Sequence, residues 1–480
     1  MQTPTPYDYL AFAAKTSPSN AAYISQDQQT NYRELHALVK NAAANLRERG
    51  IRPGENVAIH HNDIFVAYIL ILALFHEGAN CCLSWEHFDS LPIDRYLSHE
   101  MKPFMTEENT IIVNRNWIVQ SSGVSRVNVP RLHRDVEAPV IAFSSSGTTG
   151  NPKLIAISLR EMELRLYATL KSRITTGPVM TMIGLRTLAG FQTAMRALAS
   201  AEAISMPATI SAAVQILVRR RITEFMGSPS HLASITRYLS GKTILLPHLR
   251  VVYTAGAPIP SSLLNRVRTE MCQNVMGLYG SSEAGTTCLA PVHALAGHLG
   301  AGGYPVPGVE LEIVDENDQL VALGEEGIIR VRNDYCLQEY LGNPEESAIA
   351  FRDGWFYPGD IGLLRGDGLL VVTGRSVDVI NTGGLKVNPL VVEDFLLAQT
   401  GVQDAAVFAA KGVGGIDEVW AAVIPSGDLD DVALMAKAQG RLGQRAPRRI
   451  FQVSEIPRNE NDKTLRDELR DQVEQMLLEI

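Results

Sequence analysis

A chain of 480 residues is too long for one small domain and predicts more than one folded unit with a large buried core. Hydrophobic residues make up 46% and charged residues 20%, which excludes a disordered or fibrous protein. The net charge of -9 argues against nucleic acid as a partner, because phosphate backbones are bound by an excess of Lys and Arg.

The cysteines and the apolar runs predict where such a protein works. The five cysteines form no CxxC pair and have no histidines at metal-site spacing, so we expect free thiols in a reducing, cytoplasmic location. The longest apolar run, residues 64–75, is too short to span a membrane and predicts a buried helix capped by Asp63 and Gly78. No basic-then-apolar signal segment opens the sequence, so secretion is not expected.

Helical stretches alternate with short β-branched runs as far as about residue 375, which predicts parallel strands joined by crossover helices. Residues 140–143 and 251–253 are two such strands, and each leads into a loop of small residues, where open α/β sheets bind ligands. Three later runs between Gly and Asp turns predict a β-rich subregion: residues 309–314, 327–332 and 368–373.

The last hundred residues predict a separate, small α+β unit. Its β-α-β-β-α pattern consists of residues 378–380, 389–397, 405–409, 419–424 and a helix from about residue 432. A terminal helix follows, because Leu465, Leu469, Val473 and Leu477 share one helical face. We therefore expect a large domain of residues 1–374 and a small domain of residues 375–480.

The sharpest local signal is the run Ser-Ser-Ser-Gly-Thr-Thr-Gly-Asn-Pro-Lys at residues 144–153. Glycines let backbone N–H groups approach a polyphosphate, the hydroxyls donate hydrogen bonds, and Lys153 supplies positive charge. The run is not a GxxxxGK[ST] loop, because its lysine follows Asn-Pro and no Ser or Thr comes next. Taken alone, a flexible surface turn explains it equally well.

Six further strings occur in order along the chain. They are AGAPIP at residues 255–260, YGSSE at 279–283, GWFYPGD at 354–360, GRSVDVI at 374–380, GGLKVNP at 383–389 and PRNENDK at 457–463. With the glycine-rich run they resemble the adenylate-forming superfamily of acyl-CoA synthetases, aryl-acid ligases, luciferases and peptide-synthetase adenylation domains. The resemblance covers nearly the whole chain and implies a large α/β domain followed by a small, mobile domain.

The resemblance implies a nucleotide site built from several strings. Asp360 would accept hydrogen bonds from both ribose hydroxyls, Arg375 would hold the ribose or a phosphate, and Tyr279 and Val372 would enclose the adenine. A turn aspartate, a surface arginine and plain core residues are the alternatives. The remaining nucleotide-binding residues would be Ser145, Ser146, Gly147, Thr148, Thr149, Lys153, Ala255, Gly256, Ala257, Leu278, Gly280 and Ser282.

Catalytic roles follow from charge as well as from the resemblance. Attack of a carboxylate on the α-phosphate brings two anions together, so a cation must neutralise the developing charge, and Lys463 would supply it. Thr148 would act beside it, and Glu283 would hold Mg²⁺, a hard cation that prefers oxygen ligands. Gly383 and Gly384 would line the tunnel for the thiol.

Several positions depart from the superfamily pattern. Asp462 stands where a glycine normally precedes the lysine, and Val377 occupies a hinge position that is usually polar. The histidine that many relatives carry near the acid's carboxylate is absent, and Arg186 is a candidate to replace it, although a helix-surface charge explains Arg186 equally well. The expected acid pocket comprises Leu185, Arg186, Ser228, Thr254 and Ser281.

These observations predict an enzyme that uses ATP and Mg²⁺ to turn a carboxylic acid into an acyl-adenylate and then passes the acyl group to a thiol. Coenzyme A is the expected acceptor, and the phosphopantetheine arm of an acyl carrier protein is the alternative. A homodimer is left open. A different class, a degenerate nucleotide-binding homologue, also stays open because of Asp462 and the missing histidine, whereas the retained Lys463 argues against it.

Overall fold

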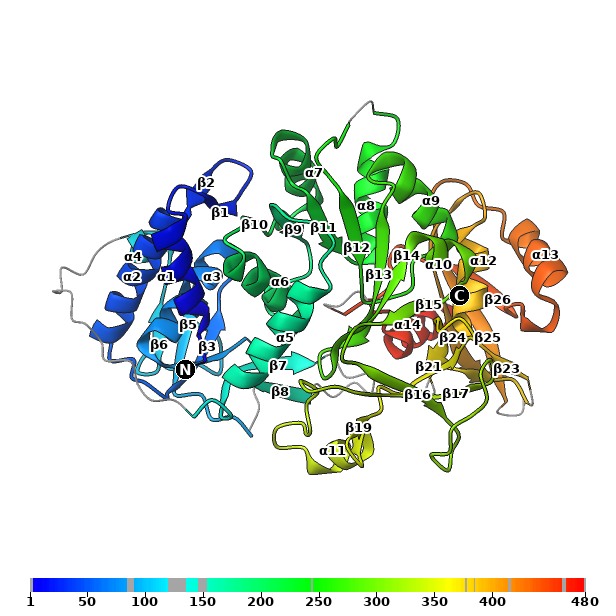
Figure 1. Ribbon diagram of the computed structural model, residues 1–480. Helices are drawn as coiled ribbons and strands as arrows, with labels where there is room; N and C mark the ends of the chain where they lie inside the picture. The colour runs from blue at the N-terminus through cyan, green and yellow to red at the C-terminus, as the bar shows by residue number, and fades with distance from the viewer. Residues whose placement is uncertain are drawn as a thin grey trace.

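The computed structural model describes most of the chain as an α/β protein (Figure 1). The described residues are 3–83, 90–119, 135–145, 153–242, 245–375, 378–383, 385–412, 416–459 and 463–478, with the backbone alone for Ser145 and Lys386. Their strands form sheets of fifteen, six, three and two strands. The predicted α/β class with a smaller C-terminal α+β region is confirmed.

The N-terminal sheet carries the predicted phosphate loop. Its order is β6-β5-β3-β4-β7-β8, and every pair is parallel except the antiparallel pair β7–β8. The loop therefore closes a hairpin and does not lead into a crossover helix, which the expectation of parallel strands did not foresee. The strands are β3 (Asn56–His60), β4 (Asn80–Cys82), β5 (Arg95–Ser98), β6 (Thr110–Ile112), β7 (Pro139–Ser145) and β8 (Lys153–Ser158).

Helix α3 (Ile64–Glu77) is the predicted buried helix. The Asp63 side chain accepts hydrogen bonds from the backbone N–H groups of the first turn, and Gly78 ends the helix with φ +82°, a left-handed conformation that glycine adopts without strain. Its apolar residues are buried all round, which confirms the prediction. The neighbouring helices are α1 (Pro6–Thr16), α2 (Tyr32–Glu48) and α4 (Arg115–Val119).

The fifteen-stranded sheet begins with parallel strands. The run β1-β10-β9-β11-β12-β13 is parallel throughout, and β2 closes one end antiparallel to β1. The bounds are β1 (Ala21–Ile24), β2 (Gln29–Asn31), β9 (Val179–Thr181), β10 (Ile204–Ser205), β11 (Glu224–Gly227), β12 (Val251–Thr254) and β13 (Val275–Ser281).

Helices cover both faces of this parallel part. On one face, Phe225, Val252 and Val275 share a buried apolar cluster with α7 (Ile210–Arg219), α8 (Pro229–Leu239) and α9 (Ser261–Glu270). On the other face, α6 (Leu188–Ala199) contacts β11, and α5 (Leu159–Lys171) packs beside α6. Burial on both faces explains why these strands read as nearly continuous apolar runs.

Antiparallel pairing begins at β13–β14, and the sheet continues through hairpins. The three predicted strands of the β-rich subregion correspond to β16, β17 and β21, so that prediction is confirmed. The elements are β14 (Gly285–Pro291), α10 (Val292–Gly297), β15 (Ala301–Pro305), β16 (Glu310–Val314), β17 (Glu326–Arg332), α11 (Pro344–Ala350), β18 (Phe351–Arg352), β19 (Trp355–Phe356), β20 (Asp360–Leu364) and β21 (Leu370–Arg375).

The C-terminal region has hydrophobic clusters of its own, formed by residues between 380 and 477. Its elements follow the predicted order, and the predicted terminal face is confirmed, because Leu469 and Val473 are fully buried. A boundary at residue 375 stays a prediction. The elements are β22 (Ile380–Asn381), β23 (Lys386–Val387), α12 (Pro389–Leu397), β24 (Val402–Lys411), β25 (Asp417–Pro425), α13 (Asp431–Leu442), a 3-10 turn (Gly443–Arg445), β26 (Arg449–Gln452) and α14 (Arg466–Leu478).

Two further features concern the helices and the cysteines. Among the helices of the described ranges, none combines the length and the apolarity that crossing a bilayer requires. The five cysteines are free thiols, as the sequence predicts.

Candidate active site

The predicted site residues gather at one edge of the parallel sheet. Strands β9, β11, β12 and β13 are neighbours, and their carboxyl ends lead directly into the predicted loops. Thr254 and Ser281 end two of these strands, and Ser228 follows a third. Ligands bind at this edge in open α/β sheets, because the connecting loops meet there.

Asp360 is a buried carboxylate held by two partners from different strands. It begins β20, is 7% exposed, and accepts a hydrogen bond from the Tyr279 phenol at 2.7 Å. The Arg375 guanidinium at the end of β21 lies 3.2 Å away. Burial and the Asp360 charge raise the pKa of Tyr279 well above its usual value, so the phenol stays a donor. Asp360 is thus a buried acceptor that two partners hold in place.

Glu283 lies in the turn between β13 and β14 and is 9% exposed. Its carboxylate accepts a hydrogen bond from the Tyr340 phenol at 2.8 Å. Its backbone carbonyl accepts from Arg165 Nη2 at 2.6 Å and from the Leu337 N–H at 3.1 Å. The side chain and the turn are therefore both held in place.

Lys463 approaches these carboxylates from the C-terminal region. Two hydrogen bonds of 3.0 Å hold its backbone: the Asn459 N–H donates to the Lys463 carbonyl oxygen, and the Lys463 N–H donates to Asn459 Oδ1. Burial of the ammonium, and next the Arg375 charge, lower its pKa to about 8, while Asp360 and Glu283 act in the opposite direction. The lysine, the arginine and the two carboxylates form one electrostatic unit.

Lys153 forms a second cationic centre at the start of β8. Its ammonium donates to Glu346 Oε2 at 2.7 Å and lies 4.8 Å from the centre of the Tyr340 ring. Since the Tyr340 phenol donates to Glu283, this tyrosine links the end of the predicted phosphate loop with the predicted metal carboxylate. The sequence strings did not indicate Tyr340 or Glu346.

Several predicted residues lie outside the described part of the chain. They are Ser146, Gly147, Thr148, Thr149, Gly384, Val377 and Asp462. For Ser145 the structure gives the backbone, which pairs with Lys153 across the hairpin. Gly383 adopts φ +81° between β22 and β23.

The predicted adenine residues occupy two neighbouring strand ends. Ala255, Gly256 and Ala257 follow β12, and Leu278 lies on β13. At Gly280 a Cβ atom would lie 2.1 Å from the Gly285 carbonyl oxygen, so only glycine fits there. The other predicted nucleotide residues described on or beside these strands are half-buried: Tyr279, Ser282 and, on β21, Val372.

The residues predicted for the acid pocket have separate local roles. Leu185 is buried in the core, and Ser228 caps α8, its hydroxyl 2.8 Å from His231 Nδ1. The Ser281 hydroxyl accepts from the Ala284 N–H at 3.2 Å. Arg186 is half-buried. Burial of His60 is the main cause that lowers the pKa of this histidine to about 4, and the Arg186 charge is the second cause. No recorded contact among the described residues joins these side chains into one pocket.

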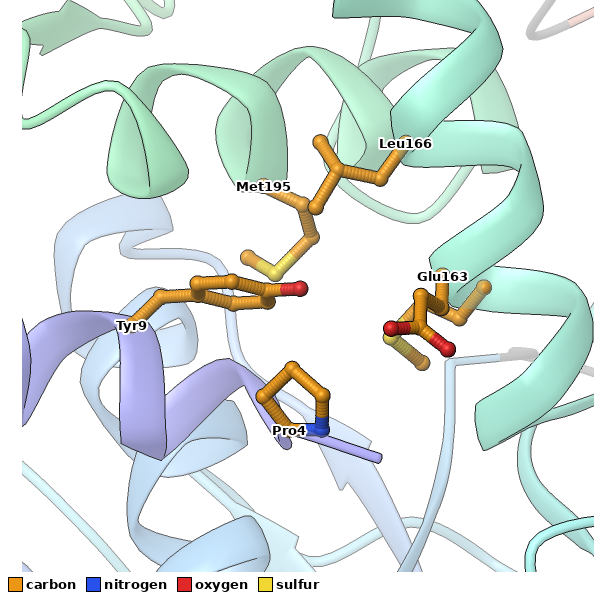
Figure 2. A pocket seen from close by; sticks show the side chains of 6 residues that line it. Pro4, Tyr9, Glu163, Leu166 and Met195 are labelled. Carbon is orange, nitrogen blue, oxygen red and sulfur yellow. The ribbon is translucent and has the colours of Figure 1, made fainter. Parts of the chain in front are cut away.

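Two small hollows are present in the described part. Figure 2 shows the first, where Tyr9 and Pro4 face Glu163, Leu166 and Met195. It contains none of the predicted site residues. The second adjoins the Glu283 turn and is lined by Arg165, Gln192 and Tyr335 among others. Arg165 lies on the buried face of α5, three residues after Met162. A charged residue at this position of the helical pattern is the signal by which sequence reasoning could have found the second hollow.

A magnesium ion fits this site only together with a nucleotide. No cluster of three or more His, Cys, Asp or Glu side chains able to hold a metal occurs among the described residues. Mg²⁺ is commonly held by one or two carboxylates plus substrate phosphates, and Glu283 is a rigidly held carboxylate at the correct edge of the sheet.

The parallel sheet with its antiparallel extension has the fold of adenylate-forming enzymes. Residues 10–84 and 89–341 match the model of the family described as AMP-binding enzyme, and the chain belongs to that family.

Curated relatives match over almost the whole chain. The 2-succinylbenzoate–CoA ligase of Geobacillus sp. (strain WCH70) is 27% identical, over 98% of this chain and 98% of its own. The 4-chlorobenzoate–CoA ligase of Arthrobacter sp is 26% identical over 97% and 95%. The feruloyl-CoA synthase of Amycolatopsis sp is 27% identical over 95% and 96%.

Solved structures show the same fold. O-succinylbenzoate coenzyme A synthetase from Bacillus subtilis, in complex with its acyl-adenylate intermediate, superposes with a TM-score of 0.83 at 22% identity, over 96% of this chain and 98% of that chain. ATP-bound MatB from Rhodopseudomonas palustris superposes with a TM-score of 0.83 at 20% identity, over 98% and 99%.

Proposed function

We propose that this protein is an acid–thiol ligase that activates a carboxylic acid with ATP and transfers the acyl group to coenzyme A. The observation that carries the proposal is the convergence of Lys463, Arg375, Asp360 and Glu283, from distant parts of the chain, on one edge of the sheet. The relatives of 26–27% identity that are named as CoA ligases support the same reaction. The free cysteines support a cytoplasmic location.

The first half-reaction needs positive charge where two anions meet. Below about pH 8 the Lys463 ammonium is charged and neutralises the α-phosphate as the acid's carboxylate attacks. Asp360 accepts from the ribose hydroxyls, and Arg375 holds the ribose or a phosphate. Glu283, together with the phosphates, would hold Mg²⁺, which would supply positive charge at the leaving pyrophosphate.

The second half-reaction requires the thiol to reach the acyl-adenylate. We propose that the C-terminal region rotates between the two steps, with Gly383 and Gly384 lining the thiol path. Contacts between α9 and α12 would have to open. Asp394 of α12 accepts from the Ser261 N–H at 3.1 Å, and the Ser262 hydroxyl donates to the Leu397 carbonyl oxygen at 3.5 Å. Helix α9 has no side-chain cap of its own.

An acid-dependent exchange of pyrophosphate into ATP tests the proposal. We expect exchange with at least one acid from a panel of aliphatic, aryl, dicarboxylic and amino acids, followed by thioester formation when coenzyme A is added. Thioester formation only with a phosphopantetheinylated carrier protein would instead favour the carrier as acceptor. Nucleotide binding without exchange for any acid would identify a degenerate homologue and refute the proposal.

Replacing Tyr340 by phenylalanine tests the link to the metal carboxylate. The change removes the hydroxyl that orients Glu283 but keeps the ring beneath Lys153. A hydrogen bond to a charged group contributes about 1.5–3 kcal/mol, and part of it is replaced by water here. We expect the Mg²⁺ concentration for half-maximal exchange to rise about three- to tenfold, with the acid's KM unchanged.

The matched control for this change is Tyr238→Phe, on the exposed side of α8. It should leave the Mg²⁺ dependence at the wild-type value. If Tyr340→Phe also does so, the phenol only packs, and the assignment of Glu283 to the metal loses this support.

A further inference from the structure

Lys463 belongs to one of two short stretches of chain that pair with each other. The Asn459 N–H donates to the Lys463 carbonyl oxygen at 3.0 Å, and the Lys463 N–H donates to Asn459 Oδ1 at 3.0 Å. Directly beside this pair, Arg458 and Thr464 lie opposite each other in an antiparallel bridge. The position of the Lys463 backbone therefore depends on what holds Arg458 and Thr464.

The Arg458 guanidinium fastens both stretches to a strand of the C-terminal sheet. Its Nη2 donates to both carboxylate oxygens of Asp404, at 3.1 Å each, and Asp404 lies on β24. Its Nη1 donates to the Thr464 hydroxyl at 3.2 Å. Charge-assisted hydrogen bonds of this kind are stronger than neutral ones. One side chain thus joins β24, the stretch before Lys463 and the stretch that carries it.

A second arginine fastens the chain on the other side of Lys463. Arg466, which begins α14, donates from Nη1 to Glu393 Oε1 of α12 at 2.6 Å. The same nitrogen donates to the Val407 carbonyl oxygen of β24. Asp404 and Val407 lie three residues apart on one strand. The segment that carries Lys463 is therefore anchored to β24 at both of its ends.

The fold itself needs the Arg458–Asp404 pair little. The two side chains are 24% and 29% exposed, and ion pairs that water reaches add little to stability. Helix α14 is held by apolar packing instead, because Leu469 and Val473 are fully buried in a cluster with residues of β24. What the pair does fix is the place of Lys463 relative to that strand.

We propose that Arg458, held by Asp404, is a positioning residue for Lys463 in the adenylation step. The inference rests on the proposed function, in which the ammonium neutralises charge at the α-phosphate. Such stabilisation depends on exact placement, and a displacement of about 1 Å can cost about 100-fold in rate. Thioester formation should not depend on this placement, because the charge at the α-phosphate is needed only while the adenylate forms.

The test separates the two half-reactions in Asp404→Asn and in Arg458→Met. We expect pyrophosphate exchange to slow about tenfold in each, with an unchanged KM for ATP, because the ammonium loses its fixed place while the proposed ribose site is intact. Conversion of a chemically supplied acyl-adenylate to thioester should stay within about twofold of wild type. The double variant should be no slower than Arg458→Met, since the two side chains act as one unit.

A conservative variant gives a further check on the mechanism. Arg458→Lys keeps the positive charge, so it can still pair with Asp404, but its single ammonium cannot also take the place of the Nη1 donor to Thr464. We expect its exchange rate to lie between those of wild type and Arg458→Met. A rate equal to that of Arg458→Met would show that charge at this position does not place the lysine.

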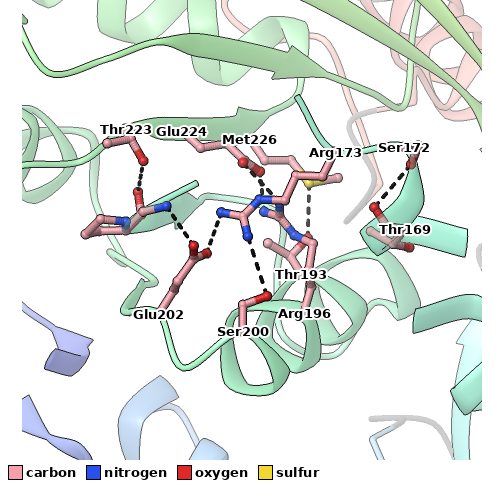
Figure 3. Close-up of polar contacts among 12 residues, drawn as sticks. Thr169, Ser172, Arg173, Thr193, Arg196, Ser200, Glu202, Thr223, Glu224 and Met226 are labelled. Carbon is pink, nitrogen blue, oxygen red and sulfur yellow. Dashed lines mark hydrogen bonds and ion pairs between the residues drawn. The ribbon is translucent and has the colours of Figure 1, made fainter. Parts of the chain in front are cut away.

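Two control variants distinguish positioning from stability. Lys411→Met removes an exposed ion pair with Asp417 from the same strand, β24, and should leave both half-reactions unchanged. Glu202→Gln breaks the buried pair with Arg173, which Figure 3 shows in the large domain. Because those side chains are only 16% and 7% exposed, this change should lower the melting temperature more than Asp404→Asn does. It should nevertheless keep the ratio of the two half-reaction rates.

The outcomes separate this inference from the proposed function. Equal losses in the two half-reactions, or exchange at the wild-type rate in Arg458→Met, overturn the positioning role while the ligase activity stands. A ratio of rates that falls in Glu202→Gln as well also overturns it, because the effect would then follow stability. Absence of exchange with every acid in the wild type refutes the proposed function and, with it, this inference.

Discussion

Replacing Lys463 by alanine should slow acyl-adenylate formation about 100- to 1000-fold, the usual effect of removing one charge-stabilising donor from a transition state. The ammonium lies within the field of Asp360, Glu283 and Arg375, and no other lysine of the described C-terminal region is recorded beside these groups. Conversion of a chemically supplied acyl-adenylate to thioester should continue, because charge at the α-phosphate is then no longer needed. Pyrophosphate exchange and thioester formation measure the two steps separately.

The pH dependence of the reaction is a second test of the role of Lys463. Its pKa is lowered to about 8, so the charged form prevails below pH 8 and is lost above it. We therefore expect kcat/KM for ATP to fall as pH rises through about 8. Lys463→Arg, which stays charged, should remove this decline even if its rate is lower.

A control from the same region guards against a general loss of folding. Lys437→Ala lies on the exposed face of α13 and should keep both half-reactions and the pH profile. If Lys463→Ala lost adenylation and thioester formation equally, Lys463 would have no role specific to the first step.

Replacing Asp360 by alanine should raise the KM for ATP about 10- to 100-fold. A hydrogen bond to a charged group contributes about 1.5–3 kcal/mol, and each 1.4 kcal/mol corresponds to a factor of ten. The change removes the proposed ribose acceptor and also takes the Asp360 carboxylate away from the Tyr279 phenol and the Arg375 guanidinium. The KM for the acid should change little, because the role proposed for Asp360 is at the ribose.

Steady-state kinetics with each substrate varied in turn measures this difference. Asp360→Asn should fall between wild type and alanine, since the amide oxygen still accepts from Tyr279 but carries no charge for Arg375. Asp367→Ala, in the exposed turn of the same hairpin, is the matched control. An ATP KM that stays at the wild-type value in Asp360→Ala would show that the ribose lies elsewhere.

The elements with strong local signals could be predicted from the sequence. The caps of α3 are short side-chain-to-backbone contacts within a few residues, so Asp63 and Gly78 mark the ends of that helix. The predicted helix at residues 389–397 coincides with α12, which begins with a proline after the Asn388 cap. The β7–β8 hairpin was missed, because its turn falls in the long glycine-rich run and no two-residue turn signal separates the strands.

The sequence by itself determined the family and the class of chemistry, because ordered strings of small, charged and aromatic residues carry that information in the chain. Only the tertiary structure decided which side chains meet. Tyr279 and Asp360 are 81 residues apart, Tyr340 and Glu283 are 57 apart, and Arg165 and Glu283 are 118 apart. Local propensity and periodicity describe neighbours along the chain, whereas these contacts arise when strands and helices pack together.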